Sequence, residues 1–234
     1  MADMWAAVLF DLDDTLVDHR AAARAAVVGW ARERGLQDPE DRLVERWTDL
    51  SDQHYRRYQD RELSYAEQRR VRIREFLPDV RLESDAEADA TFADYLAHYE
   101  AAWQPFPDAV PALRRARRAG ATVAVLTNGD HDHQSLKLSR TGLADEVDHL
   151  VASSRLAASK PHAAAFLDAC ARAGSTPGRT LMVGDSLELD VRGALAAGLE
   201  AVWLDRDGSG GDPGVRRVRS LDQVLPDRGP DLPH

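Results

Sequence analysis

Residues 8–16 read VLFDLDDTL, an apolar run that leads into three aspartates within four positions. The continuous hydrophobic character of the first half is typical of a strand that is buried on both faces of a sheet. Asp11, Asp13 and Asp14 follow at the point where such a strand would end. Bunched carboxylates ordinarily form a solvated turn, so their position directly after a buried strand calls for a chemical explanation.

Four further apolar runs of similar length follow in the second half of the chain, at residues 121–126, 148–153, 180–184 and 200–204. The stretches that precede or separate these runs have helical periodicity, and several end in glycine, as helix C-termini commonly do. Strand and helix therefore alternate. This pattern predicts the α/β class, with a doubly wound parallel sheet of the Rossmann-like type.

Residues 17–104 interrupt this alternation, because they contain no convincing strand and are rich in Ala, Arg, Glu and Leu. Helical periodicity within this interval predicts four helices, at residues 21–34, 39–59, 65–77 and 85–103. The sequence therefore predicts two domains. We expect residues 1–16 and 105–234 to form an α/β core domain, and residues 17–104 to form an inserted all-helical domain.

The overall charge limits the classes of partner. Thirty Lys and Arg residues against 40 Asp and Glu give the 234-residue chain a formal charge of -10, which argues against nucleic acid as a partner. An apolar run approaching 18 residues is absent, so we expect no membrane span. The start of the chain has no basic leader and the single cysteine, Cys170, excludes an internal disulfide, so we expect a cytoplasmic protein. The oligomeric state stays open.

Reactive side chains follow four of the predicted strands. Thr127 and Asn128 come directly after the second strand, Lys160 lies shortly beyond the third, and Asp185 and Asp190 follow the fourth. In a doubly wound sheet, ligands bind at the carboxyl ends of the strands. We therefore expect these side chains and the aspartates of the first strand to converge on one cleft.

The stretches DLDDT, LTN, SKP and GDSLELD, in this order and spacing, resemble the four motifs of the haloacid dehalogenase (HAD) superfamily. The helical interval after the first motif is similar to the C1-type cap of subfamily I. The second half of the chain is most similar to the phosphatase branch that includes nucleotide and sialic-acid phosphate phosphatases. The resemblance implies a phosphomonoester hydrolase that works through an aspartyl-phosphate intermediate.

The chemistry of phosphoryl transfer assigns roles to the first two aspartates. Asp11 is the expected nucleophile on phosphorus, and Asp13 is the expected acid that protonates the leaving oxygen and then deprotonates water. Alternation along an extended segment would place both carboxylates on one side and turn Asp14 away from the cleft. We therefore expect Asp14→Asn to retain far more activity than Asp13→Asn.

Four carboxylates alone would repel a phosphate dianion, since each pair of like charges ~4 Å apart costs about 4 kcal/mol at an effective dielectric near 20. A cation is therefore required, and Mg²⁺ suits oxygen ligands. Asp11 and Asp185 are the expected carboxylate ligands, and Asp190 binds directly or through water. The resemblance implies that Asp13 contributes its backbone carbonyl oxygen to the metal.

The remaining motif residues are expected to bind the phosphoryl group. Lys160 supplies a second cation that holds nucleophile and phosphate together, while Thr127 and the backbone N–H of Asn128 hold phosphoryl oxygens. The expected partner is a small phosphorylated metabolite, either a sugar phosphate or a nucleotide. Three alternatives stay open, namely a phosphomutase, a 2-haloacid dehalogenase of the same superfamily and a non-catalytic regulatory module.

Overall fold

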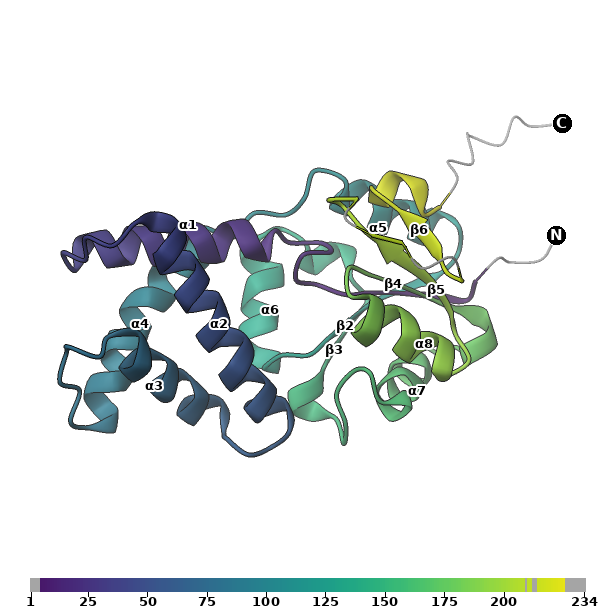
Figure 1. Cartoon of the computed structure of the whole chain (residues 1–234). Helices are drawn as coiled ribbons and strands as arrows, with labels where there is room; N and C mark the ends of the chain where they lie inside the picture. Colours follow the sequence, from purple (N-terminus) through teal and green to yellow (C-terminus); the bar gives the residue numbers. More distant parts are fainter. Residues whose placement is uncertain (1–4, 209, 212–213, 226–234) are drawn as a thin grey trace, which may run out of the picture. The chain divides into compact units, whose positions relative to one another are not determined.

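The structure is a computed structural model that describes residues 5–208, 210–211 and 214–225 (Figure 1). The ends of the predicted core domain, residues 1–4 and 226–234, lie outside these ranges. Contacts between residues divide the chain into two compact units. One unit contains the described residues up to Asp18 and from Gln104 onward, and the other spans His19–Trp103. The domain boundaries expected from the sequence, after residues 16 and 104, stay a prediction.

Within the described residues, the first unit is built on one parallel sheet with the strand order β3-β2-β1-β4-β5-β6. The strands are β1 (Ala7–Phe10), β2 (Thr122–Thr127), β3 (His149–Ala152), β4 (Thr180–Gly184), β5 (Glu200–Leu204) and β6 (Arg216–Val218). The helices of this unit are α5 (Ala109–Arg118), α6 (His131–Arg140), α7 (Ala163–Arg172) and α8 (Gly193–Ala196). The short helical segments are η1 (Ala144–Glu146), η2 (Ser153–Arg155), η3 (Pro177–Arg179), η4 (Leu187–Arg192) and η5 (Leu221–Gln223). The predicted α/β class with a parallel sheet is confirmed.

Both faces of the central strand are buried, and alternate residues of β1 contribute to two different apolar clusters. Val8 and Phe10 pack in a cluster with Leu113 of α5. Ala7 and Leu9 belong to a second cluster on the side of α7 and α8. Since successive side chains of a strand point to opposite faces, the continuous apolar run reflects a strand covered by helices on both sides.

The helix ends follow from the glycines noted in the sequence. After α7, Gly174 has φ +65, and the amide of Ser175 donates to the carbonyl of Cys170 at 2.9 Å. A residue with a Cβ would strain this left-handed backbone, whereas glycine adopts it readily. The glycine therefore ends α7 and returns the chain toward β4.

The second unit consists of four helices, α1 (His19–Glu33), α2 (Glu40–Gln59), α3 (Tyr65–Phe76) and α4 (Asp85–Ala101). A capping box starts α3, because Ser64 and Glu67 exchange side-chain and backbone hydrogen bonds, and a similar box starts α4. Its core contains a buried aromatic cluster around Trp30 and Trp47. Within the described residues of the whole chain, no helix is long and apolar enough to cross a bilayer.

The order of the strands determines where a ligand can enter the first unit. The chain runs outward from β1 through β2 to β3, and β4 then pairs with β1 on its other side. The direction of winding reverses at this point, and doubly wound sheets bind ligands outside the carboxyl ends of the strands at such a reversal, here those of β1 and β4. Asp11 and Asp185 directly follow these two ends.

Candidate active site

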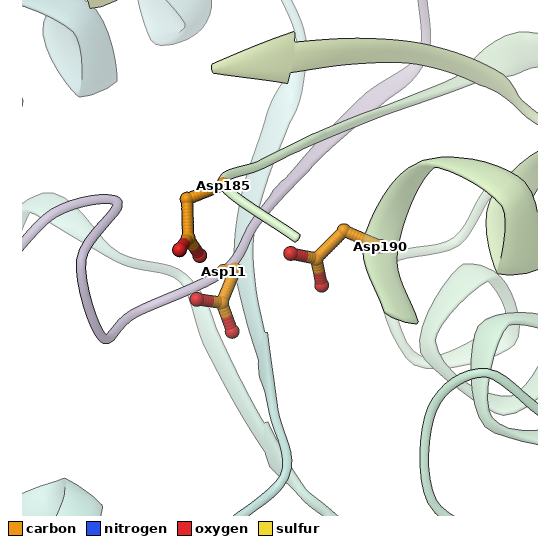
Figure 2. A group of neighbouring side chains, drawn as sticks. All are labelled: Asp11, Asp185 and Asp190. Atoms are coloured by element: carbon orange, nitrogen blue, oxygen red, sulfur yellow. The ribbon is translucent and has the colours of Figure 1, made fainter. Parts of the chain in front are cut away.

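Three carboxylates gather at the switch point of the sheet (Figure 2). Asp11 continues the pairing of β1, because its amide donates to the carbonyl of Val183 at 2.9 Å. Asp185 follows β4, and Asp190 approaches from the turn after it. One oxygen from each of the three carboxylates lies within 4.8 Å of the others. The structure therefore brings together the three acids that were expected to surround a metal ion.

Asp190 reaches this group from an unusual helical turn. Residues Leu187–Arg192 form a π-helical turn, in which the Ser186 carbonyl accepts from the amides of both Asp190 and Val191. The carboxylate also accepts from the Ser186 amide at 3.0 Å. A Cβ on Gly184 would lie 2.2 Å from Oδ2 of Asp190. Asp190 can therefore occupy this position only because residue 184 has no side chain.

Lys160 lies between two of the acids. Its Nζ donates to Asp11 and to Asp190, each at 2.6 Å, and its side chain is only 3% exposed. Burial alone would lower the pKa of Lys160, but the carboxylates of Asp11 and Asp190 raise it above its ordinary value. Lys160 is therefore a fixed ammonium group, which suits contact with both the attacking carboxylate and a phosphoryl group.

Asn128 determines where the backbone of Lys160 lies. The amide nitrogen of its side chain donates to the Lys160 carbonyl at 2.8 Å, and its side-chain oxygen accepts from the Lys160 amide at 2.8 Å. The side chain of Asn128 thus links the end of β2 to the loop that presents the lysine. Binding of a phosphoryl oxygen by the backbone N–H of Asn128 stays a prediction.

The charges of the site favour a divalent cation. Burial raises the pKa of Asp11 well above its ordinary value; Lys160 opposes this shift, whereas Asp190 and Asp185 add to it. When all three carboxylates are ionised, the single ammonium leaves two negative charges in the group, and a bound cation would favour that ionised state. An all-oxygen donor set with this charge fits a hard divalent cation such as Mg²⁺.

The turn after β1 differs from the expected extended segment. The strand ends at Phe10, and Asp14 has a left-handed backbone with φ +59 while its amide donates to the Val17 carbonyl at 2.7 Å. The expectation that strand alternation continues to Asp14 is therefore wrong, because the chain turns back on itself at this residue. Asp11 still follows the pairing of β1, and the left-handed backbone begins only at Asp14.

Two side chains that contact Asp13 were not predicted from the sequence. Lys137 of α6 forms an ion pair with Oδ1 of Asp13, and Gln134 donates to Oδ2 at 3.0 Å. The amide nitrogen of Gln134 also donates to Oγ1 of Thr127 at 2.9 Å. The available signal was the spacing of two polar residues one helical turn apart, in a helix that directly follows a strand end.

Thr15 is a third missed residue, and it positions Asp185. Its hydroxyl oxygen accepts from the Asp185 amide at 3.1 Å, and its side chain is fully buried. The indole N–H of Trp203 donates to the Asp185 carbonyl at 2.9 Å. The backbone of Asp185 is thus held from the turn after β1 and from β5.

The chain is similar in sequence and fold to several known proteins. The sequence model of the haloacid dehalogenase-like hydrolase family matches residues 5–198. Glyceraldehyde 3-phosphate phosphatase of Methanopyrus kandleri is 31% identical over 86% of this chain and 84% of its own length. Ribulose-1,5-bisphosphate 5-phosphatase of Halopiger xanaduensis is 32% identical over 86% and 85%. The solved structure of 2-haloacid dehalogenase from Pseudomonas syringae pv. tomato is 29% identical, with a TM-score of 0.68 over 94% of this chain and 96% of that chain.

Proposed function

The chain belongs to the haloacid dehalogenase-like hydrolase family and is a phosphoric monoester hydrolase, and we propose that it uses Mg²⁺ and an aspartyl-phosphate on Asp11. The substrate is a small phosphorylated metabolite of the cytoplasm, either a sugar phosphate or a nucleotide. The observation that supports this proposal best is the contact between Lys160 and both Asp11 and Asp190 within one acidic group.

In the first chemical step, a carboxylate oxygen of Asp11 attacks phosphorus as the bond to the leaving oxygen breaks. Asp13 gives its proton to the leaving oxygen, so the product leaves as a neutral alcohol. The side chain of Asp13 is 31% exposed, which leaves its carboxyl accessible to a substrate in the crevice. In the second step Asp13 takes a proton from water, which attacks phosphorus and releases Asp11 and inorganic phosphate.

The phosphoryl group carries charge that the site must neutralise. Lys160 places an ammonium beside Asp11, and Thr127 and the backbone N–H of Asn128 are the proposed donors to phosphoryl oxygens. Asp11, Asp185, Asp190 and the backbone carbonyl of Asp13 would hold Mg²⁺. When bound, Mg²⁺ would supply positive charge that offsets the charge of the phosphoryl oxygens.

Asp13 favours phosphate ester hydrolysis over the dehalogenase alternative. A halide leaves carbon as a stable anion and needs no proton donor, whereas an alkoxide leaving group needs one. The carboxyl of Asp13, two residues after the nucleophile, can supply the proton that an alkoxide leaving group needs. A phosphomutase would use the same groups and return the phosphoryl group to a second hydroxyl of the substrate.

The test is turnover of an aryl phosphate with and without Mg²⁺. We expect activity that requires Mg²⁺, stops with EDTA and falls by more than about 10³-fold in Asp11→Asn. Asp168→Asn is the matched control, because this carboxylate lies on the exposed side of α7 and pairs with Arg172. After acid quenching, a phosphoryl label should stay on the wild-type protein and be released by hydroxylamine. Metal-independent halide release, or no turnover of any phosphate ester, would contradict the proposal.

A panel of phosphorylated metabolites then identifies the substrate. Sugar phosphates and nucleotides are compared by kcat/KM, and formation of an isomeric phosphate in place of inorganic phosphate would identify a phosphomutase.

A further inference from the structure

Helix α6 buries two polar side chains on the face that is turned toward the candidate site. Gln134 is 4% exposed and Lys137 is 1% exposed, and their spacing of three residues places them one above the other on the helix. A buried ammonium is strongly unfavourable unless a counter-charge compensates it. A counter-charge beside Lys137 must therefore offset the cost of burying its ammonium group.

That counter-charge comes from Asp13, the proposed acid and base of the reaction. Lys137 is ion-paired with Oδ1, and Gln134 donates to Oδ2 at 3.0 Å. Since the two carboxylate oxygens have different donors from the same helix, rotation about the bond that joins the carboxyl to Cβ is restricted. The donors determine the plane of the carboxyl as well as its position.

Gln134 also contacts a proposed phosphate ligand. Its amide nitrogen donates to Oγ1 of Thr127 at 2.9 Å, so the oxygen of this hydroxyl acts as an acceptor toward the helix. The hydroxyl hydrogen of Thr127 must then point in another direction, which leaves it to donate to a phosphoryl oxygen.

The turn before α6 is shaped to admit Gln134. A Cβ on Gly129 would lie 2.7 Å from the Gln134 amide nitrogen, so any larger residue would displace it. Asp130 caps the helix by accepting from the His133 amide at 3.1 Å. The glycine and the cap together fix the first turn of α6 against the end of β2.

We propose that Gln134 and Lys137 form a clamp that orients the Asp13 carboxyl toward the leaving oxygen and the Thr127 hydroxyl toward the phosphoryl group. Both are positioning residues, because they act through Asp13 and Thr127. This inference rests on the proposed function, since it assigns to α6 the geometry of the proton transfer step.

Phosphate esters with different leaving groups differ in how strongly their hydrolysis depends on a proton donor, and the test compares two such esters. An aryl phosphate with an acidic phenol as leaving group depends little on protonation, whereas an alkyl phosphate depends on it strongly. In Lys137→Met we expect kcat/KM for the alkyl phosphate to fall about 10–100-fold, within the range of general acid catalysis. For the aryl phosphate, kcat/KM should stay close to that of wild type. Arg140→Met, which removes an exposed cation from the end of α6, is the control.

A second comparison separates positioning from a loss of folding. If Lys137 acts through Asp13, adding Lys137→Met to Asp13→Asn should cause no further loss on the alkyl phosphate, because the group it positions is already absent. Circular dichroism and the melting temperature of each variant establish that the fold is retained. Gln134→Met should lower kcat/KM on both substrates, since it also releases the Thr127 hydroxyl.

Three results would overturn the clamp. These are equal losses on the two substrates in Lys137→Met, full activity of that variant on the alkyl phosphate, or an additive loss in the Asp13→Asn background. Failure of the proposed function is distinguishable from these results. In that case the wild-type protein would hydrolyse neither ester, or Asp13→Asn would leave the ratio of kcat/KM for the two esters unchanged.

Discussion

Replacement of Gly184 by alanine should weaken metal binding without removing any ligand. The carboxyl end of β4 lies directly against Asp190, and a Cβ at residue 184 would be 2.2 Å from Oδ2 and 2.3 Å from Cγ of that residue. Ordinary contact begins near 3.4 Å. The carboxylate would therefore have to move by roughly 1 Å, on the difference between these distances.

The cost of this displacement has two parts. Crowding of a well-packed site costs about 1–3 kcal/mol of the free energy of unfolding. Movement of Asp190 also separates it from Lys160, which it contacts at 2.6 Å, and leaves a buried ammonium with one partner fewer. Disturbing a hydrogen-bonded group that orients a metal ligand typically lowers metal affinity by about 10–100-fold.

Phosphatase activity measured against Mg²⁺ concentration checks the prediction. For Gly184→Ala we expect the half-saturating Mg²⁺ concentration to rise about 10–100-fold, and the stabilisation of the protein by a fixed Mg²⁺ concentration to shrink accordingly. Gly178→Ala is the matched control, because no atom lies within 4 Å of a Cβ at that position. If the half-saturating concentration in Gly184→Ala stayed within about threefold of wild type, less than 1 kcal/mol, the reasoning would be refuted.

Two further predictions concern acids near the site and away from it. Asp14→Asn should keep most of the wild-type kcat, because asparagine tolerates the left-handed backbone at this position. Asp13→Asn should lower kcat by at least about 100-fold. Comparable losses of kcat in the two variants would contradict this prediction. Burial raises the pKa of Asp108, but hydrogen bonds from Arg206 and from the Leu221 amide outweigh burial and lower it. Asp108→Asn should therefore lower the free energy of unfolding by about 1–3 kcal/mol at pH 7. In urea denaturation this deficit should narrow as the pH falls below about 4 and Asp108 becomes protonated in the wild type, whereas a deficit independent of pH would contradict the assignment.

The sheet was predictable because its signal is local. Each buried strand is a short apolar run, and the helices that follow end at glycines such as Gly174, so strand and helix could be located by periodicity alone. The order of the strands also follows from a general rule, since a doubly wound sheet places the first strand at its centre. Acids that directly follow strand ends, such as Asp11 and Asp185, could therefore be assigned to one crevice.

The turn after β1 could not be predicted in the same way. Its shape depends on the hydrogen bond from the Asp14 amide to the Val17 carbonyl and on a left-handed backbone at a non-glycine residue. Aspartate is among the few residues that adopt this backbone, but it does so in a minority of cases. Extrapolating the alternation of the strand was therefore wrong at Asp14.

Gln134 and Lys137 were missed for a different reason. A helix rich in polar residues is ordinarily interpreted as a solvent-exposed surface, and lysine is among the residue types least often buried. Which face of α6 is buried depends on how the helix packs against the sheet, and this is a tertiary property. The contacts of Gln134 and Lys137 with Asp13 form because β1 and β2 pair side by side, and this pairing is a property of the tertiary structure.

The two buried lysines, Lys137 and Lys160, would allow the proposed site to bind a dianion despite the net charge of -10 on the chain. Before Asp13 takes up the proton that it later gives to the leaving oxygen, the four carboxylates of Asp11, Asp13, Asp185 and Asp190 face two ammonium groups, which leaves two negative charges in the group. A divalent cation would neutralise this remainder, and only then would a phosphate dianion enter a site without net repulsion. Because Lys137 neutralises Asp13 locally, the metal has to compensate only the three carboxylates around Lys160. The proposed requirement for a divalent cation therefore depends on the number and position of the lysines as much as on the number of acids.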